Sequence, residues 1–245
     1  MNGEMDPCVR LAWDSEFFGL SMARVCGQTL DDARAAAVEA WCRRERVGCA
    51  YFLARADDPA TSQCAEKHGY SLVDIRVELE CKLTADDATQ PSTNARLAVE
   101  SDLPALESIA RESFTDSRFY ADGHFPRAKC DALYVRWVQE SLRGFADAVL
   151  VTPQQGPSAA FVTCKLEEAG AAGRIGLLGV DPRQRGHGLG QKIVHEALAW
   201  FAAGGARRVR VVTQGRNIAS QRLYQRCGFL THSVGLYYHK WWSID

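Results

Sequence analysis

The stretch from Ile175 to Val194 constrains the fold more than any other part of the chain. It begins with an apolar run from Ile175 to Val180 that is typical of a buried strand, and it turns at Asp181-Pro182. A loop with three glycines follows, and the chain then enters a segment whose apolar residues recur at helical spacing: Leu189, Ile193, Val194, Ala197, Leu198 and Phe201. This order predicts a strand, a loop and an amphipathic helix of an α/β protein.

The glycines Gly186, Gly188 and Gly190 alternate at the start of the predicted helix, where they indicate an anion site. Glycine has no Cβ to block a ligand, and positive φ angles cost it little. The first turn of a helix has free N–H groups and the positive end of the helix dipole. Arg183 and Arg185 add positive charge beside the loop. We therefore expect a cradle for a pyrophosphate.

The spacing separates this loop from two other phosphate-binding motifs. A P-loop needs G-x-x-x-x-G-K-[ST], and no Lys-Ser or Lys-Thr pair follows here. A dinucleotide fingerprint needs G-x-G-x-x-G and an acid after the next strand, whereas the predicted strand from Arg207 to Thr213 continues with Gln-Gly-Arg. The pattern that fits is [R/Q]-x-x-G-x-[G/A], met by Arg185, Gly188 and Gly190.

A second motif lies about thirty residues downstream, with Asn217 at a helix start, Tyr224 two turns later, and Gly228-Phe229 where the helix ends. The two motifs, in this order, resemble those of the GNAT acetyltransferase superfamily. The resemblance implies an α/β (α+β) fold, in which a mixed central sheet is flanked by helices. It also implies acetyl-CoA as co-substrate and direct acetyl transfer without an acyl-enzyme.

The resemblance assigns roles to particular residues. The pantetheine is expected to bond to the backbone of Leu178, Gly179 and Val180 as an added strand would. The pyrophosphate is expected at Arg185, Gly186, His187, Gly188, Leu189 and Gly190. Asn217 is expected to bond the pantetheine, to cap its helix, or to do both. Tyr224 is expected to be the general acid that protonates the leaving thiolate of coenzyme A.

The general base is not assigned. Many members of the superfamily place a Glu or His on the strand before the glycine loop, but the run from Arg174 to Val180 contains neither. Glu167, Glu168 and His124 are candidates that would act through a water molecule.

A narrower resemblance covers nearly the whole chain. Segments such as Trp13-x-x-x-Phe17-Phe18-Gly19, Ser117-Arg118-Phe119 and Thr213-Gln214 are similar to those of dTDP-fucosamine acetyltransferases. These enzymes N-acetylate dTDP-4-amino-4,6-dideoxygalactose, and the resemblance implies a homodimer. Arg118 is a candidate for the nucleotide diphosphate, and Phe119 or Tyr120 for stacking on thymine. A protein, peptide or small-amine N-acetyltransferase, and a non-catalytic module that binds coenzyme A, are the alternatives.

Three segments make up the predicted domain organisation. Residues 1–83 are expected to form a truncated GNAT-like domain, because Glu66-Lys-His-Gly-Tyr70 echoes Gln225-Arg-Cys-Gly-Phe229. This domain lacks a glycine loop, so we expect no cofactor there. Residues 84–94 are polar and without periodicity, as in a linker, and residues 95–245 form the acetyltransferase domain.

Composition narrows the partners and the compartment. The net charge of −1 favours neither nucleic acid nor an anionic membrane, although ten basic and two acidic residues between 174 and 226 suit a polyanionic small ligand. We expect neither a signal peptide nor a membrane-spanning stretch. Nine scattered cysteines indicate free thiols in the reducing cytoplasm. The six histidines do not pair with cysteines at ligand spacing, so no metal site is expected.

Overall fold

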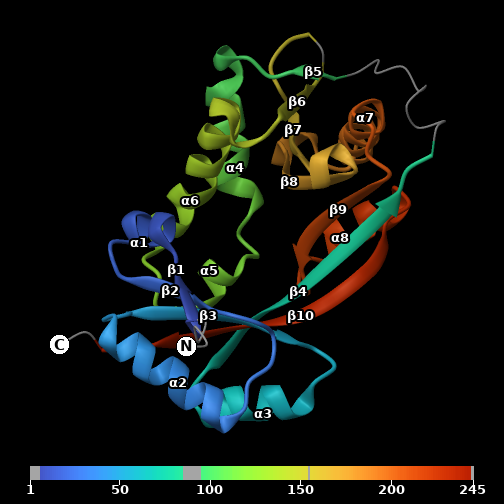
Figure 1. Ribbon diagram of the computed structural model, residues 1–245. Helices are drawn as coiled ribbons and strands as arrows, with labels where there is room; N and C mark the ends of the chain where they lie inside the picture. The colour runs from blue at the N-terminus through green and yellow to red at the C-terminus, as the bar shows by residue number, and fades with distance from the viewer. Residues whose placement is uncertain (1–5, 85–94, 154, 244–245) are drawn as a thin grey trace. The chain divides into compact units, whose positions relative to one another are not determined.

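The computed structural model describes residues 6–84, 95–153 and 155–243, and these form two compact units (Figure 1). The first unit comprises Met1–Arg76, Ser117–Lys129 and Val234–Asp245, and the second comprises Val77–Asp116 and Cys130–Ser233. Two segments expected in the acetyltransferase domain, 117–129 and 234–245, therefore lie in the first unit. All but the first residue of the predicted linker lies outside the described residues.

In the first unit, three strands and the later part of a fourth, β10 (Leu230–Trp241), pair in the order β1-β2-β3-β10. Strand β2 runs parallel to β3, with a helix between them in the chain, and β10 runs antiparallel to β3. The elements are β1 (Cys8–Arg10), α1 (Ala12–Phe18), β2 (Met22–Val25), α2 (Asp32–Arg44), β3 (Cys49–Arg55), α3 (Pro59–Lys67), α5 (Arg118–Ala121) and the first half of β4 (Ser71–Lys82).

In the second unit, the strand order is β4-β9-β8-β7-β6-β5. The sheet is mixed, because β8 pairs antiparallel with β7 and parallel with β9. This confirms the mixed sheet with flanking helices. The elements are β5 (Arg96–Leu97), η2 (Glu100–Asp102), α4 (Leu103–Ser113), most of α6 (Arg127–Glu140), η3 (Ser141–Phe145), β6 (Ala148–Thr152), β7 (Ala160–Glu167), η4 (Glu168–Gly170), β8 (Ala172–Val180), η5 (Pro182–Gln184), α7 (Leu189–Ala203), β9 (Arg208–Gln214), α8 (Ile218–Arg226) and the start of β10 (Leu230–Trp241).

The two units repeat one pattern of elements. Three consecutive elements of the first half of the chain recur at a constant spacing in the second half. β3 starts at 49 and β9 at 208, α3 at 59 and α8 at 218, and β4 at 71 and β10 at 230, and the ends of each pair have the same spacing. The caps repeat too, because the Asp58 side chain accepts from the Thr61 N–H and the Asn217 side chain from the Ser220 N–H. The five-residue echo in the sequence is thus part of a longer structural repeat.

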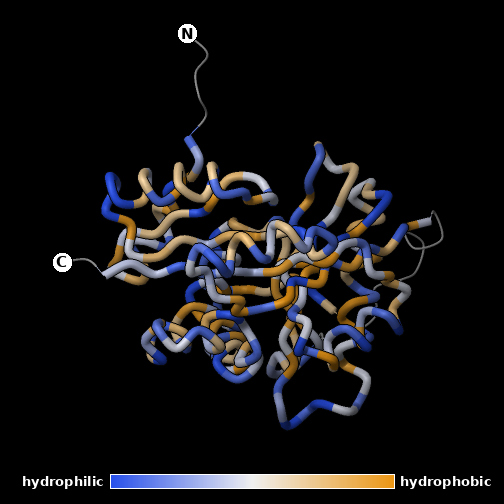
Figure 2. Tube along the Cα trace, turned by 90° about the horizontal axis from the view of Figure 1, so that it is seen from below, coloured by the Kyte–Doolittle hydropathy of each residue, from blue (hydrophilic) through white to orange (hydrophobic). Residues whose placement is uncertain are grey.

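Each unit has its own apolar core. The core of the second unit lies between its sheet and helices α7 and α8, and includes Ile175, Ile193, Phe201, Val209 and Phe229. In Figure 2 hydrophobic stretches run along part of the extended chain, whereas the coiled segments alternate between hydrophobic and hydrophilic residues. Helices with one apolar face cover a sheet in this way. Among the described residues, no helix has both the length and the apolar character needed to cross a membrane.

Glycines on β8 let neighbouring elements approach the strand closely. A Cβ on Gly173 would lie 2.4 Å from the Phe201 ring of α7. A Cβ on Gly179 would lie 2.6 Å from Phe161 on β7 and 2.7 Å from Ile109 on α4. Glycine in a strand often marks such a close approach. Without these glycines, α7 and α4 would have to move away from β8.

We predict that Gly173→Ala lowers the free energy of unfolding by about 1–3 kcal/mol, because the added methyl group overlaps the buried Phe201 ring. Equilibrium unfolding in urea measures the change. Gly123→Ala is the control, since its Cβ would meet nothing within 4 Å, and its effect should stay within about 0.5 kcal/mol. Equal losses in both variants would contradict the packing explanation.

Candidate functional site

Strands β8 and β9 pair over only part of their length. Within the described residues, the parallel pairing runs from Ala172 opposite Arg208 to Ile175 opposite Val211. β8 continues to Val180, and there it pairs with β7 alone, ending with Val180 opposite Ala160. The edge of β8 from Gly176 to Val180 therefore has no strand beside it on the side of β9.

The hydrogen bonds of β8 show which backbone groups face this gap. The Asp181 N–H donates to the Ala159 carbonyl at 2.8 Å, and the Leu177 N–H donates to the Thr163 hydroxyl at 2.8 Å, so both point toward β7. Successive backbone groups of a strand point to opposite sides. The N–H groups of Leu178 and Val180 therefore face the gap, whereas the N–H of Gly179 faces β7.

The glycine loop lies between the end of β8 and the start of α7. Gly186 and Gly188 have φ angles of 82° and 78°, and a Cβ on either would meet nothing within 4 Å. Backbone conformation, not crowding, therefore requires these glycines. Gly188 is the N-cap of α7 and no side chain caps this end, so the N–H groups of the first turn are available to an anion.

Arg185 and Gly190 hold the loop in place. The Arg185 Nε donates to the Val180 carbonyl at 3.2 Å, and its Nη2 lies 3.4 Å from both the Glu112 carbonyl and the Ser113 hydroxyl. These contacts link the end of β8 to the end of α4. A Cβ on Gly190 would lie 3.2 Å from Leu223, so this glycine lets α7 approach α8. His187 is exposed.

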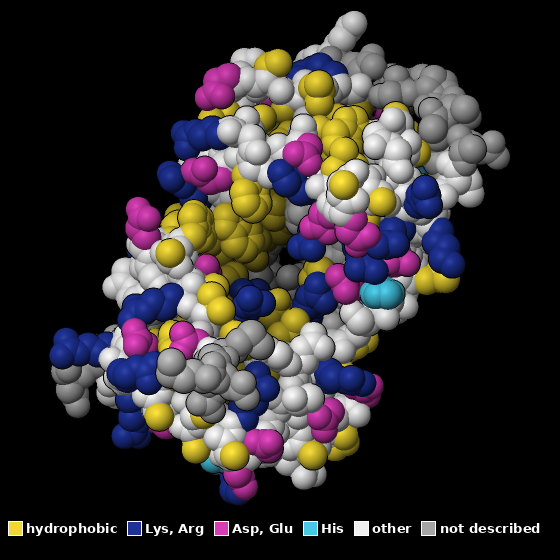
Figure 3. Space-filling view, in the orientation of Figure 1, with side chains coloured by type: hydrophobic (Ala, Val, Ile, Leu, Met, Phe, Trp, Pro, Cys, Tyr) yellow, Lys and Arg dark blue, Asp and Glu magenta, His cyan; other side chains and the backbone are white. Residues whose placement is uncertain are grey.

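The positive field around the loop is weaker than a count of arginines suggests. At least four of the ten basic residues between 174 and 226 are paired with carboxylates. The pairs are Arg174–Glu167, Arg183–Asp181, Arg208–Glu168 and Arg210–Glu80. On the face that Figure 3 shows, Lys and Arg side chains are interspersed with Asp and Glu. The preference of the loop for an anion therefore rests mainly on the start of α7.

Helix α8 positions Asn217 and Tyr224. The Asn217 side-chain oxygen, Oδ1, accepts from the Ser220 N–H at 2.9 Å, so this residue caps the helix. Tyr224 is 5% exposed, and its ring contacts Phe229 edge-on. Burial raises the pKa of the Tyr224 phenol well above its usual value, which keeps the hydroxyl protonated at neutral pH. The phenol is therefore in the protonated state that a proton donor needs. No described residue hydrogen-bonds to its hydroxyl.

Two residues that the sequence analysis did not single out support this arrangement. The Gln221 side chain donates to the Gln214 and Gly215 carbonyls at 3.1 and 2.9 Å, which fixes the turn between β9 and α8. Thr163 lies where the β7–β8 register shifts, and its hydroxyl binds the Leu177 N–H. Both roles depend on contacts between separate segments, and no sequence motif marks them.

The three candidate bases are all bound to other side chains. Arg174 binds Glu167 at 2.8 Å, and Arg208 binds Glu168. Glu167 also lies opposite Ala172, at the end of β8 remote from the glycine loop. His124 belongs to the first unit, where its Nδ1 lies 2.7 Å from the Asp122 carboxylate. None of the three is assigned as the base.

The residues expected to bind the nucleotide lie in an aromatic cluster of the first unit. The Arg118 guanidinium lies over the rings of Tyr51, Phe119 and Tyr237, 4.4–5.0 Å from their centroids. Phe119 is 1% exposed and packs against other aromatic rings. It is a core residue with almost no exposed surface, so stacking of Phe119 on thymine is not proposed further. Tyr120 is half-buried beneath Arg127.

Residues 103–229 match the acetyltransferase (GNAT) family, and the match covers more than half of the chain. The chain belongs to the GNAT acetyltransferase family. It is an N-acetyltransferase that depends on acetyl-CoA. The predicted family and fold class are confirmed. The half-paired β8 and the open glycine loop are thus features of a GNAT enzyme.

Relatives and solved structures agree with this family. The dTDP-fucosamine acetyltransferase of Escherichia coli O6:H1 (strain CFT073) is 28% identical over 94% of this chain and 96% of its own length. The spore coat polysaccharide biosynthesis protein SpsD of Bacillus subtilis (strain 168) is 26% identical over 63% of this chain and 53% of its own. A GCN5-related N-acetyltransferase from Sphaerobacter thermophilus shares the fold, with a TM-score of 0.66 and 19% identity over 96% of this chain and 76% of its own.

We predict that Gly188→Ala raises the KM for acetyl-CoA about tenfold, because a positive φ at the N-cap strains alanine and shifts the first turn of α7. Steady-state kinetics measure the change. Gly205→Ala is a matched control, since Gly205 has a φ of 87° with nothing within 4 Å of its Cβ and lies after α7. An equal KM increase in Gly205→Ala would show that backbone strain alone is responsible.

A buried polar network in the first unit centres on Asp122. Its carboxylate accepts from His239 at 2.6 Å, His124 at 2.7 Å and Trp241 at 2.9 Å. Burial opposes ionisation, but these three donors outweigh it and lower the pKa of Asp122. His239 is 1% exposed and stacks near Tyr51. Burial lowers its pKa to about 4, although Asp122 opposes the shift and Arg118 adds to it.

We predict that folding stability falls as the pH drops from about 6.5 to about 4, because the unfolded chain protonates His239 before the folded chain does. The stabilisation by the neutral His239 is fully present above pH 6.5, decreases as the pH falls, and is lost below about pH 4. It amounts to about 3 kcal/mol. Urea unfolding at several pH values measures it. His239→Gln should reduce the slope, and the exposed His232→Gln on the same strand should not. Equal slopes in the three proteins would contradict the assignment.

Proposed function

We propose that this enzyme transfers the acetyl group of acetyl-CoA to the 4-amino group of a dTDP-linked 4-amino-4,6-dideoxyhexose. The observation that carries the choice of acceptor is the similarity to a dTDP-fucosamine acetyltransferase, which extends over 94% of this chain and 96% of the relative. The similarity to a polysaccharide biosynthesis protein supports the same class of substrate. The likeness includes the first unit, so it extends beyond the acetyl-CoA site.

The gap beside β8 is our proposed site for the pantetheine. The N–H groups of Leu178 and Val180 face it and would bond to the pantetheine as to an additional strand. One such N–H directed at the thioester oxygen would stabilise the oxyanion by about 3 kcal/mol. The open loop from Gly186 to Gly190 would take the pyrophosphate.

Tyr224 is our proposed general acid. The neutral sugar amine attacks the thioester carbonyl carbon and forms the new C–N bond. As the tetrahedral intermediate collapses, the C–S bond breaks and the Tyr224 hydroxyl gives its proton to the thiolate. The amine gives up its proton to water, and the tyrosinate is reprotonated from solvent. The raised pKa of Tyr224 makes the tyrosinate short-lived, because a buried phenolate is costly.

The first unit is proposed to be a truncated GNAT copy that does not bind coenzyme A. The N-cap of its α2 is Asp31, whose carboxylate accepts from the Arg34 N–H at 2.8 Å and so occupies the helix start. An anion would be repelled from this position. In the repeat, Ala65 stands where the second unit has Tyr224. The first unit thus lacks both the cradle and the acid.

The first unit is instead our candidate for recognition of the acceptor. Arg118 and Tyr120 remain the proposed contacts for the diphosphate and for thymine, since both are half-buried and retain accessible surface. A homodimer and a cytoplasmic location also remain proposals. The nine free thiols fit the reducing conditions of that compartment.

We predict that Tyr224→Phe lowers kcat about 10²–10³-fold with little change in the KM for acetyl-CoA, because only proton donation is lost. Thiol release with dTDP-4-amino-4,6-dideoxygalactose measures both constants. Tyr70→Phe is the control, since it removes the hydroxyl of a buried tyrosine in the first unit. A kcat for Tyr224→Phe close to that of the parent would contradict the role of Tyr224.

The acceptor is tested in the same assay with a panel of amines. dTDP- and UDP-linked 4-amino sugars are compared with lysine peptides and simple amines at matched concentrations. A kcat/KM at least tenfold higher for the dTDP-linked 4-amino sugar would support the proposal. A preference for a lysine peptide or a simple amine would replace it with the corresponding alternative acceptor.

A further inference from the structure

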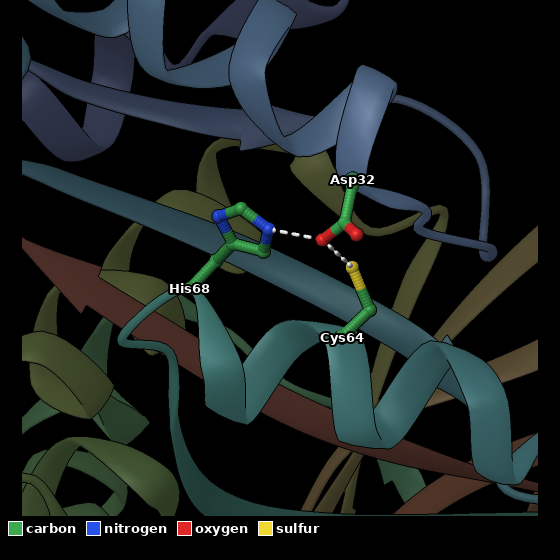
Figure 4. A group of neighbouring side chains, drawn as sticks. All are labelled: Asp32, Cys64 and His68. Carbon is green, nitrogen blue, oxygen red and sulfur yellow. Dashed lines mark hydrogen bonds and ion pairs between the residues drawn. The ribbon is translucent and has the colours of Figure 1, made fainter.

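Three side-chain atoms of types that can bind a metal lie close together between α2 and α3 of the first unit. Asp32 lies in the first turn of α2, and Cys64 and His68 lie at the end of α3. Figure 4 shows all three side chains pointing toward one another. The His68 Nε2 lies 2.7 Å from the Asp32 Oδ1, and the Cys64 Sγ lies 3.9 Å from the same oxygen. All three donor atoms lie within 4.8 Å of one another.

The equivalent positions of the second unit do not carry the same three residues. In the second unit, Gln191, Leu223 and Cys227 stand at the positions of Asp32, Cys64 and His68. The contact between α7 and α8 there is apolar, with Leu223 packed close to Gly190. The first unit thus has a carboxylate, a thiol and an imidazole where its counterpart packs a leucine.

The cluster differs from the expectation that no cysteine and histidine stand at ligand spacing. Cys64 and His68 are four residues apart, and a helix places such residues on one face. The third ligand comes from α2, more than thirty residues earlier in the chain. A local motif search does not bring it together with the other two.

We propose that Asp32, Cys64 and His68 bind a Zn²⁺ ion that joins α2 to α3. Zinc takes thiolate, imidazole and carboxylate ligands in a tetrahedron, with bonds of about 2.0–2.3 Å, which places neighbouring donor atoms about 3.3–3.7 Å apart. The observed separations of 2.7 and 3.9 Å lie on either side of this range, so small side-chain shifts complete the site. A water molecule is the fourth ligand.

The ligand types select the metal and the protons that binding releases. Calcium and magnesium prefer oxygen ligands alone, whereas a thiolate and an imidazole together suit zinc. Binding requires the Cys64 thiol to lose its proton to solvent and the His68 Nε2 to present its lone pair. The neutral His68 then carries its proton on Nδ1.

Lys67 competes with the metal for the Asp32 carboxylate. Its Nζ lies 2.8 Å from both carboxylate oxygens. The side chains of Lys67 and Asp32 are each 65% exposed, so the ammonium group can move into water when a dication arrives. An exposed ion pair of this kind is weak, and we therefore expect Lys67 to reduce zinc affinity only modestly.

The test uses the full chain, stripped with a chelator, and Co²⁺ as a spectroscopic probe for the Zn²⁺ site. We expect a near-ultraviolet band from cobalt–thiolate charge transfer and tetrahedral bands in the visible, both removed by Zn²⁺. Cys64→Ser should abolish the thiolate band, and His68→Gln should weaken Co²⁺ binding at least about tenfold. Lys67→Gln should tighten it roughly two- to fivefold.

Cys26→Ser is the matched control. Among the described cysteines, only Cys26 and Cys64 are half-buried, and the other seven are buried. The Cys26→Ser protein should bind Co²⁺ as the parent does. The proposal is overturned if the parent shows no thiolate band, if Cys64→Ser retains it, or if Cys26→Ser loses it. Asp32→Asn should weaken Co²⁺ binding at least about tenfold, and unchanged affinity in that variant would overturn the three-ligand site. Acetyl transfer is not used as a readout, so this proposal stands or falls apart from the proposed function.

Discussion

The partial pairing of β8 with β9 is the constraint on which the rest of the proposed acetyl-CoA site depends. The two strands share their ladder as far as Ile175 and Val211 and then separate. Beyond that point β8 is held from its other side, by β7 and by the Thr163 hydroxyl at the register shift. The separated strands leave backbone donors unpaired, and they also lead the chain into the two helix starts at Gly188 and Asn217.

Packing keeps the strands apart in this arrangement. Glycines on β8 admit Phe201 from α7 and Ile109 from α4, so helices cover the strand closely on both faces. Arg185 bonds the end of β8 to α4, and Gln221 bonds the turn after β9 to α8. The gap is therefore bounded by packed elements, and a rigid gap keeps its donors directed at one place, as catalysis requires.

The sequence predicts those parts of the site that are local in the chain. The glycine loop, the Asn217 cap and the Tyr224 helix are each encoded within about ten residues, and their spacing suffices to find them. Contacts between distant segments could not be read in this way. Arg210 is neutralised by Glu80, from a strand far earlier in the chain, and Asp122 meets His239 and Trp241 at the other end. The sequence does not reveal that Phe119 is buried, because its neighbours in the core are not its neighbours in the chain.

The repeat explains why the two units are not contiguous in the chain. Strand β4 follows α3 in the chain, yet its second half pairs within the second unit, while the later part of β10 pairs with β3. β4, which follows α3, thus contributes a strand to the second unit, and β10, which follows α8, contributes a strand to the first.

This exchange governs the order in which the chain can fold. During synthesis, β3 emerges early, but its antiparallel partner, Gly235–Trp241, is made only after the whole of the second unit. Closing a loop of that length is slow and entropically costly. This edge of β3 therefore remains unpaired with β10 in the nascent chain until the second unit has been synthesised.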